Sequence, residues 1–135
     1  MKVLRNWDNK TWLSSKAYIN SINLFLLKKK KLNKKSKILD IGCGRGKIFG
    51  SLSRKLKLNN KPIGVDPVPH KDVDKLIDFR NEDAFNFFKT NQNKFDLIMI
   101  KQTLHFFDKD ERKKLIKICK NNLKKNGLLI IFSLN

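Results

Sequence analysis

The sequence predicts a single α/β domain built on an open, mainly parallel sheet of five strands with flanking helices. Short apolar segments alternate with amphipathic segments along the chain, which is the pattern of strands joined by helical crossovers. Several apolar segments are nearly continuous in Ile, Leu, Val, Phe and Met, as expected for strands buried on both faces. The length of 135 residues fits one domain, so any function has to fit on one core.

The first half of the chain predicts a helix, a strand, a glycine-rich turn and a second helix. Residues 16–27 carry apolar side chains at helical spacing, and Ser14 and Ser15 before them suit an N-cap. Residues 37–41 have the composition of a buried strand, which the glycines of residues 42–46 end. Helical spacing resumes over residues 47–58. The turn is therefore expected at the carboxyl end of the first strand.

Four further strands are expected, over residues 62–66, 76–79, 95–100 and 127–133. The connection over residues 67–74 is too short for the usual crossover helix, so that edge of the sheet is expected to be irregular. Asp83 can cap a short helix that runs through Phe88, and Asp108 with Glu111 resembles a capping box. The stripe that this last helix is expected to bury consists of Leu115, Ile118, Cys119 and Leu123.

The charge of the chain is strongly positive, with 31 Lys and Arg against 12 Asp and Glu and a formal net charge of +19. Such a charge attracts phosphate backbones, which makes RNA a candidate partner. The lysines are nevertheless spread over nearly every segment together with abundant Asn, Ile and Phe, a mixture that A+T-rich codons would also give. The dense cluster over residues 28–37 is most simply a solvated connection into the first strand. The composition alone leaves RNA binding open.

The sequence also argues against several classes of protein. No segment approaches the roughly 18 apolar residues that cross a bilayer, and residues 1–10 lack the apolar stretch of a signal peptide. We therefore expect a cytoplasmic protein without membrane contact. Cys43 and Cys119 lie far apart, with no Cys-x-x-Cys or Cys/His cluster, which predicts reduced thiols and no metal site.

The glycine-rich turn carries the most specific signal in the chain. A dinucleotide fingerprint of the form G-x-G-x-x-G, counted from Gly42, would need glycine at position 47, where this chain has Lys47. The segment Ile38-Leu39-Asp40-Ile41-Gly42-Cys43-Gly44-Arg45-Gly46 instead resembles motif I of the class I, Rossmann-like S-adenosylmethionine-dependent methyltransferases. That motif often runs hydrophobic-hydrophobic-Asp-hydrophobic-Gly-Cys-Gly-x-Gly, and the resemblance extends over about residues 37–133.

The resemblance implies a site for S-adenosylmethionine, with S-adenosylhomocysteine as the product, at the carboxyl ends of the strands. Asp66 closes the second strand, where the family's acidic residue accepts hydrogen bonds from both ribose hydroxyls. Asp83 matches the Asp that accepts from the adenine amino group, and Ala84 and Phe85 match the residues that pack on the ring. Taken singly, each residue also fits a turn or a helix cap. The cofactor-binding residues expected from the resemblance are Asp40, Gly42, Cys43, Gly44, Gly46, Asp66, Pro67, Asp83, Ala84 and Lys101.

The sequence gives weaker evidence for catalytic residues than for cofactor-binding residues. Methyl transfer from a sulfonium is an in-line displacement that can proceed with little beyond positioning. The loop after the fourth strand normally faces the methyl group in the family, so His105 is the candidate general base, with an unperturbed pKa of about 6.5. Packing beside the neighbouring phenylalanines is an equally simple role for His105. Lys101 and Gln102 rank below it, and His70 lies in a Pro-rich turn.

The same loop narrows the class of acceptor. It reads Lys101-Gln102-Thr103-Leu104, so it lacks the Asp/Asn-Pro-Pro-Tyr/Phe of enzymes that methylate amino groups in nucleic acids. It also lacks the Asp of RNA ribose methyltransferases. The stretch from Leu104 to Asp108 is closer to methyltransferases of small molecules, which is the leading hypothesis. An RNA acceptor is the charge-driven alternative, and a non-catalytic cofactor-binding module acting through a partner is the third.

Two parts are expected along the chain, a helical segment over residues 1–36 and the cofactor-binding core over residues 37–135. In related enzymes an N-terminal segment often covers the site. Trp7, Trp12 and Tyr18 could supply apolar and cation-π contacts there, although an aromatic set beside a helix more often belongs to the core.

The sequence stops at Asn135, immediately after the last expected strand. Family members continue from this strand into a helix and an antiparallel hairpin that completes the sheet. We therefore expect the strand to be an exposed hydrophobic edge, either because the sequence is truncated, which is the favoured reading, or because a homodimer pairs this edge.

Overall fold

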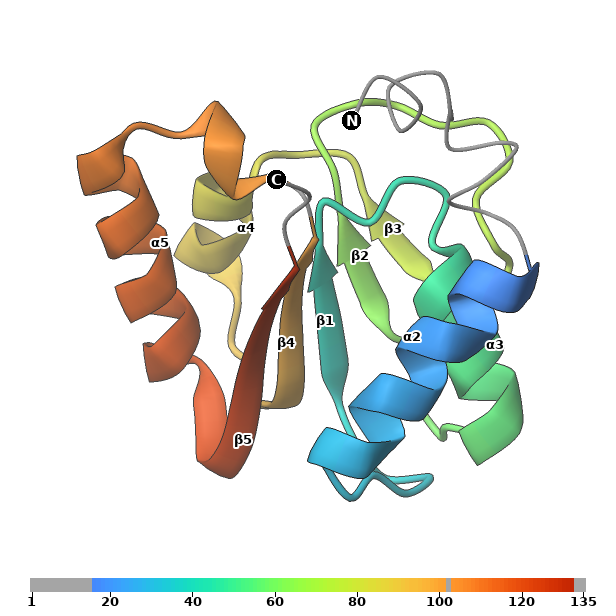
Figure 1. Cartoon of the computed structure of the whole chain (residues 1–135). Helices are drawn as coiled ribbons and strands as arrows, with labels where there is room; N and C mark the ends of the chain where they lie inside the picture. The colour runs from blue at the N-terminus through green and yellow to red at the C-terminus, as the bar shows by residue number, and fades with distance from the viewer. Residues whose placement is uncertain (1–15, 102, 133–135) are drawn as a thin grey trace.

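The computed structural model describes residues 16–101 and 103–132, and within them the chain folds around one five-stranded sheet (Figure 1). The strand order is β3-β2-β1-β4-β5, and every pair of neighbours runs parallel. The strands are β1 (Ile38–Ile41), β2 (Ile63–Val65), β3 (Asp78–Arg80), β4 (Phe95–Lys101) and β5 (Leu123–Phe132). The expected parallel α/β fold of five strands is confirmed.

Helices cover both faces of the sheet (Figure 1). They are α2 (Lys16–Lys29), α3 (Lys47–Leu56), α4 (Ala84–Thr90) and α5 (Lys109–Asn121), with the 3-10 turn η1 (Leu104–Phe106) after β4. Helices α2 and α3 pack on one face, and α4 and α5 pack on the other. Among the described helices, none combines the length and the apolar character that crossing a membrane would require.

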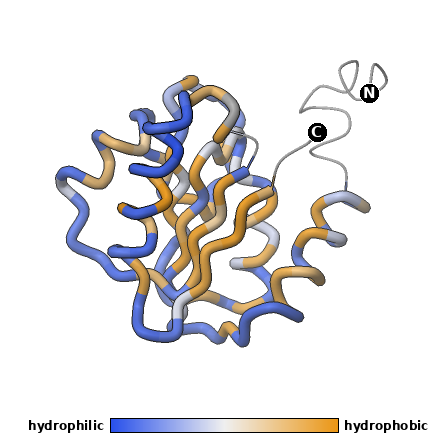
Figure 2. The backbone as a smooth tube through the Cα atoms, turned by 60° about the vertical axis from the view of Figure 1, so that its left-hand side comes forward, coloured by the Kyte–Doolittle hydropathy of each residue, from blue (hydrophilic) through white to orange (hydrophobic). Residues whose placement is uncertain are grey.

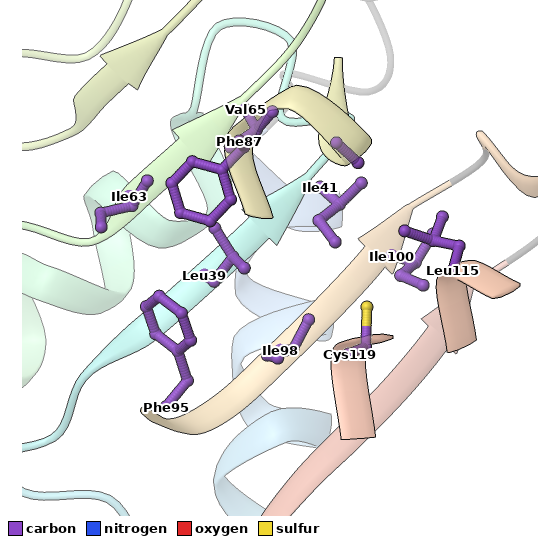
Figure 3. Close-up of a cluster of buried hydrophobic side chains, with 11 residues drawn as sticks. Leu39, Ile41, Ile63, Val65, Phe87, Phe95, Ile98, Ile100, Leu115 and Cys119 are labelled. Atoms are coloured by element: carbon purple, nitrogen blue, oxygen red, sulfur yellow. The ribbon is translucent and has the colours of Figure 1, made fainter. Parts of the chain in front are cut away.

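The core consists of two clusters, one on each face of the sheet. On the α4 and α5 face, Leu39 and Ile41 of β1 meet Ile98 of β4 and Phe87 of α4 (Figure 3). On the other face, Ile38 belongs to a cluster with residues of β4, α2 and α3. Because successive side chains of a strand point to opposite faces, the near-continuous apolar runs in the sequence reflect burial of both faces.

The predicted boundaries at both edges of the sheet were wrong. The third strand begins at Asp78, and Leu76 precedes it outside the strand. Leu123 was expected on the buried stripe of the last helix, but it begins β5 and pairs with Phe95. Helix α5 ends at Asn121, and the carbonyl of Asn122 accepts a hydrogen bond from the Phe95 amide at 2.9 Å. That bond turns the chain into the sheet before the helical stripe is complete.

Other local expectations were correct. The connection from β2 to β3 contains no helix. The capping box of α5 is present, because the Asp108 side chain accepts from the Glu111 amide at 2.8 Å and the Glu111 side chain accepts from the Asp108 amide at 3.1 Å. Strand β5 forms one edge of the sheet, and its Ile131 is 41% exposed. Pairing of this edge in a homodimer stays a prediction.

The β2–β3 connection is fixed to α3 by one buried carboxylate. Asp74 receives two hydrogen bonds from the Arg54 guanidinium at 2.9 Å each, and its backbone amide donates to the Arg45 carbonyl at 2.9 Å. A Cβ atom on Gly50 would lie 2.3 Å from the Asp74 carboxylate. The Asp74 side chain is only 3% exposed, so it has little room to move aside.

We therefore expect Gly50→Ala to destabilise the protein. Alanine favours a helix interior over glycine by about 1 kcal/mol, yet here the added methyl group displaces Asp74 and breaks its pair with Arg54. Removing one partner of such a pair costs up to about 3 kcal/mol when the remaining charge stays buried. Thermal unfolding should show a lower Tm for Gly50→Ala and an unchanged or higher Tm for Ser51→Ala in the same helix. A higher Tm for Gly50→Ala would contradict this account of the contact.

Candidate functional site

A cavity of about 670 Å³ opens at the carboxyl ends of the strands, within the range of roughly 300–1,000 Å³ typical of small-molecule sites. It receives residues from the glycine-rich turn, the ends of β2 and β4, the start of α4 and the turn η1. The lining residues are Ile41, Gly42, Cys43, Gly44, Arg45, Lys47, Ile48, Val65, Asp66, Pro67, Val68, His70, Asp83, Ala84, Lys101, Thr103, Phe106 and Phe107. Of the ten predicted cofactor-binding residues, all except Asp40 and Gly46 line this cavity.

The glycine-rich turn is held open by backbone angles that favour glycine. Gly42, Gly44 and Gly46 have φ angles of 77°, 57° and 71°, all in the left-handed region. A Cβ on Gly42 would also lie 2.2 Å from Cγ2 of Thr103, whereas a Cβ on Gly44 would have no neighbour within 4 Å. Gly44 therefore leaves free space above the turn where a ligand can approach the main chain.

Asp66 ties the glycine-rich turn to the end of β2. Its carboxylate accepts hydrogen bonds from the amides of Gly44 and Val68 at 2.8 and 2.9 Å. Nε2 of His70 lies 3.6 Å from Oδ2 of Asp66. Asn81 donates its side-chain amide to the carbonyls of Asp66 and Pro67 at 3.0 Å each. The carboxylate thus stands in the cavity wall with its position fixed from several sides.

Asp40 is the most unusual ionisable group near the cavity. It is 1% exposed, and within the described residues neither of its carboxylate oxygens has a hydrogen-bond partner. Burial raises the pKa of Asp40 from 3.8 to about 7, the charge of Lys101 opposes this rise, and the charge of Asp66 adds to it. The hydroxyl of Thr103, on the cavity wall, is likewise buried without a partner in the described part of the chain. Unpaired buried oxygens of this kind suit a ligand that brings a cation or N–H donors.

Because the pKa of Asp40 is higher in the folded than in the unfolded chain, the unfolded chain releases this proton first as pH rises. The free energy of unfolding should therefore fall between about pH 4 and pH 7, by up to about 4 kcal/mol. Asp40→Asn should match the parent protein at pH 4 and exceed its stability above pH 7. Urea unfolding across this range measures the difference, with the exposed Asp72→Asn as a control. Parallel pH profiles for the parent and Asp40→Asn would contradict the assignment.

Cys43 lines the cavity as a neutral thiol. Burial, together with the charges of Asp40 and Asp66, raises the pKa of the Cys43 thiol well above its ordinary range. Its sulfur lies 3.4 Å from the Gly44 carbonyl, to which the thiol donates. Burial also raises the pKa of Cys119 to about 12. Neither thiol is therefore suited to act as a nucleophile.

Asp83 serves as both a helix cap and a cavity residue. Its carboxylate accepts from the backbone amide of Asn86 at 2.8 Å and from the Asn86 side chain at 3.0 Å, so the capping role considered for it is present. It also lines the cavity together with Ala84, which is buried. Phe85 packs edge-on against Phe107 at 5.6 Å between ring centroids, which joins the start of α4 to the segment after η1.

The predicted catalytic residue His105 belongs to the turn η1, and its role stays a prediction. The neighbouring Phe106 and Phe107 line the cavity, and Phe106 is 76% exposed. Trp7, Trp12 and Gln102 lie outside the described residues. Tyr18 packs against the core cluster on the α2 and α3 face, as the alternative reading of the aromatic set supposed. The role of residues 1–36 as a cover of the site stays a prediction.

Sequence reasoning missed several residues of the cavity wall. His70, which the sequence places in a Pro-rich turn, lies beside Asp66 and packs edge-on against Phe79 at 6.2 Å between ring centroids. Its spacing of four residues from Asp66 would predict a contact on a helix, but this connection contains no helix. Thr103 belongs to the cavity wall and lies against Gly42, 61 positions earlier at the end of another strand. No local pattern in the sequence predicts a contact between such distant positions.

Comparison with known proteins agrees with this geometry. The family described as "Methyltransferase domain" matches residues 38–127. Two carboxy-S-adenosyl-L-methionine synthases of Helicobacter pylori, from strains G27 and HPAG1, are 29% and 30% identical over 120 residues. These matches cover 85% of this chain and 48% of each synthase, so the chain spans about half the length of these relatives.

Solved structures of methyltransferases share the fold. A plantazolicin methyltransferase, crystallised with a triazolic desmethylPZN analogue and SAH, has a TM-score of 0.74 and 24% identity over 99% of this chain and 52% of that one. Coclaurine N-methyltransferase, bound to N-methylheliamine and SAH, has a TM-score of 0.66 and 16% identity over 84% of this chain and 35% of that one. Since the family match covers two thirds of the sequence and includes the glycine-rich turn, the chain belongs to the methyltransferase-domain family, as its resemblance to class I S-adenosylmethionine-dependent methyltransferases predicted.

Proposed function

We propose that this chain binds S-adenosylmethionine in the 670 Å³ cavity and takes part in methyl transfer to a small-molecule acceptor. The observation that carries the proposal is the buried Asp40 carboxylate, unpartnered within the described residues, two positions before the glycine-rich turn. S-adenosylmethionine carries a sulfonium and an ammonium group, and a buried carboxylate stabilises such a cation. The pyrophosphate of a dinucleotide would instead meet the Asp66 carboxylate, which accepts from the Gly44 amide of the turn.

The residues of the cavity suit the other parts of this cofactor. Asp66 offers a fixed carboxylate to the ribose hydroxyls, in addition to the two amides that it already accepts from. Asp83 and Ala84 stand together at the cavity wall for the adenine. The main chain at Gly44, with open space above it, allows close contact. S-adenosylmethionine supplies the methyl group on a positively charged sulfur, so the leaving group needs no protein acid.

The chain's own contribution to methyl transfer is then positioning and exclusion of water. Phe106 and Phe107 give the cavity apolar walls next to η1. His105 in the same turn is the proposed general base for an acceptor that has to lose a proton. The thiols do not take part, because burial keeps Cys43 and Cys119 protonated.

A small-molecule acceptor is supported by the size and the apolar part of the cavity, about 670 Å³. Its wall carries Arg45, Lys47 and Lys101 as well as Asp66 and Asp83, so the proposal does not rest on the charge of the wall. The wall at Val68, Phe106 and Phe107 is apolar. The plantazolicin and coclaurine methyltransferases, which share the fold, were crystallised with small organic or peptide-derived compounds. RNA as the acceptor stays an alternative driven by net charge.

A second candidate is formation of carboxy-S-adenosylmethionine, in which the cofactor itself is modified: its methyl group loses a proton and takes up a carboxyl group released by a small organic acid. The observation that favours it is the match to four carboxy-S-adenosyl-L-methionine synthases at 28–30% identity, which share up to 85% of this chain. The two candidates use the same cavity and the same residues for the cofactor. They differ in the product that leaves.

The experiment that separates them is mass spectrometry of the products after incubation with S-adenosylmethionine and a panel of small organic acids, amines and phenols. Methyl transfer predicts S-adenosylhomocysteine together with a methylated panel compound, and His105→Gln should lower the rate about 10²-fold or more if it is the base. Carboxy-S-adenosylmethionine would identify the second candidate. If the chain binds the cofactor but forms neither product, the result would favour the non-catalytic module.

A further inference from the structure

Four segments at the amino ends of the strands, which we call the four loops, have an unusual shared composition. They comprise residues 30–37, 57–62 and 91–94, which precede β1, β2 and β4, and residues 120–126, which join the end of α5 to the first residues of β5. Together they contain 11 lysines, eight asparagines and no Asp or Glu. Strands that run parallel place these loops at one edge of the sheet, opposite the cavity. Figure 2 shows the loops at the lower edge mainly in the hydrophilic colour, below the hydrophobic strands.

These loops form one continuous surface, which we call the amino-edge surface. They contact one another directly through hydrogen bonds that link sequence segments far apart. The bonds are Asn59 amide to Lys34 carbonyl at 2.7 Å, Lys30 Nζ to Asn126 carbonyl at 2.8 Å, Asn91 Nδ2 to Asn122 Oδ1 at 2.9 Å and Lys37 Nζ to Asn93 Oδ1 at 3.5 Å. The lysines of all four loops therefore act as one field of positive charge.

The carboxylates of the protein are distributed unevenly about the sheet. Among the described residues, the carboxylates at the amino edge are Asp78, the first residue of β3, and Asp96, the second residue of β4. Both are already paired, Asp78 with Arg80 at 2.9 Å and Asp96 with Lys124 at 3.0 Å. The carboxyl edge carries most of the rest, namely Asp66, Asp72, Glu82, Asp83, Asp108, Asp110 and Glu111. A lysine-rich composition alone would not separate the acidic groups in this way. The asymmetry leaves the amino edge strongly positive, which suits a partner that is itself strongly negative.

The chemistry of the amino-edge surface favours RNA over a membrane. The large hydrophobic side chains exposed in the described residues are Leu24, Phe25, Val68, Phe106 and Ile131, and none belongs to the four loops. A surface that lies in a bilayer interface needs apolar side chains to insert, and a surface that reads unpaired bases needs aromatic rings to stack on. Lysines with asparagine amides instead suit phosphates and sugar hydroxyls.

The surface is also hollowed. A cavity of about 470 Å³ lies between the starts of β1, β2 and β4 and beside β3. Lys37, Lys61 and Asn93 stand in its wall, together with one carboxylate, Asp78, which is paired with Arg80 at 2.9 Å. The two lysine ammonium groups and the asparagine amide of this concave site match a phosphate with its neighbouring sugar.

We propose that the amino-edge surface docks onto base-paired RNA through its phosphates and 2′-hydroxyl groups. Double-helical RNA is recognised chiefly by shape, phosphates and 2′-hydroxyls, which are the groups that lysines and asparagine amides can bind. Because the surface and the 670 Å³ cavity lie at opposite edges of the sheet, RNA bound in this way leaves the cavity accessible. The RNA is therefore a docking partner and not the methyl acceptor.

The test is fluorescence anisotropy of a labelled RNA duplex of about 16 base pairs, the span of a typical double-stranded RNA contact, titrated with the full chain at several salt concentrations. Neutralising Lys31, Lys34, Lys35 and Lys125 to Gln, all exposed, removes four charges from the amino-edge surface. The matched control neutralises the exposed Lys71, Lys75, Lys109 and Lys113, which lie toward the carboxyl edge. Both variants should bind S-adenosylhomocysteine like the parent.

We expect the amino-edge variant to bind the duplex at least tenfold more weakly and to lower the slope of log affinity against log salt by about three, since each phosphate contact contributes about 0.7–0.9. The control variant should keep the parent's affinity within about twofold. Three results would overturn the proposal: equal losses in both variants, no binding by the parent chain at low salt, or equal affinity for a DNA duplex of the same sequence.

Discussion

Asp66→Ala should abolish measurable binding of S-adenosylmethionine and S-adenosylhomocysteine at micromolar concentrations. The carboxylate is the group proposed to accept both ribose hydroxyls, and each charged hydrogen bond contributes roughly 1.5–3 kcal/mol. Losing two of them lowers affinity by about 100-fold or more. The change also frees the amides of Gly44 and Val68, which Asp66 now accepts, so the wall of the site loosens together with the contact to the ligand.

Calorimetric titration measures this effect, with Asp72→Ala as the matched control. Asp72 is exposed in the same β2–β3 connection and does not line the cavity, so its removal should leave affinity unchanged. Thermal unfolding of both variants without ligand separates loss of binding from loss of fold. If Asp66→Ala stays folded and binds S-adenosylhomocysteine like the parent, the ribose assignment is wrong.

Gly42→Ala should have an effect of similar size by a different route. Alanine at a φ of 77° costs about 1–2 kcal/mol, and its Cβ would lie 2.2 Å from Cγ2 of Thr103 and 3.0 Å from the Lys101 carbonyl. Either the turn or the end of β4 has to shift, and both line the cavity. We expect a loss of roughly 2–4 kcal/mol in stability and at least a tenfold loss in cofactor affinity.

Two further variants distinguish the effect of backbone strain at the glycine from the effect of the collision with Thr103. Gly44→Ala has the same kind of backbone angle but no neighbour within 4 Å of the added Cβ, so its unfolding free energy should fall by only about 1–2 kcal/mol. The double variant Gly42→Ala with Thr103→Ser removes Cγ2 and should regain part of the stability that Gly42→Ala loses. Equal losses for Gly42→Ala and Gly44→Ala, without recovery in the double variant, would mean that the collision with Thr103 is not the cause.

The sheet and the glycine-rich turn could be predicted because their signals are local. Strands such as residues 95–100 are almost entirely apolar, and the order of strand, turn and helix follows from neighbouring residues. Asp66 and Asp83 could be found in the same way, since Asp66 directly follows β2 and Asp83 comes three positions after the end of β3. The capping box of Asp108 and Glu111 could also be predicted, because its two residues lie within four positions of the sequence.

What could not be predicted depends on contacts between distant segments. Leu123 was placed on a helix because its spacing from Leu115 and Cys119 suits one, but its pairing with Phe95 makes it the first residue of β5. The burial of Asp40 depends on how β1 sits between β2 and β4, and the amino-edge surface appears only when four separate loops meet. The net charge of +19 did not indicate that basic and acidic residues lie at opposite edges of the sheet, because a sum of charges carries no information about position.

The most direct test of the cofactor assignment is a calorimetric titration of the purified chain with S-adenosylhomocysteine and, in parallel, with NAD. Asp40, Asp66 and the spacing of the three glycines predict micromolar binding of S-adenosylhomocysteine and no detectable binding of NAD. Binding of NAD, or no binding of S-adenosylhomocysteine by a folded chain, would contradict the proposed use of this cavity.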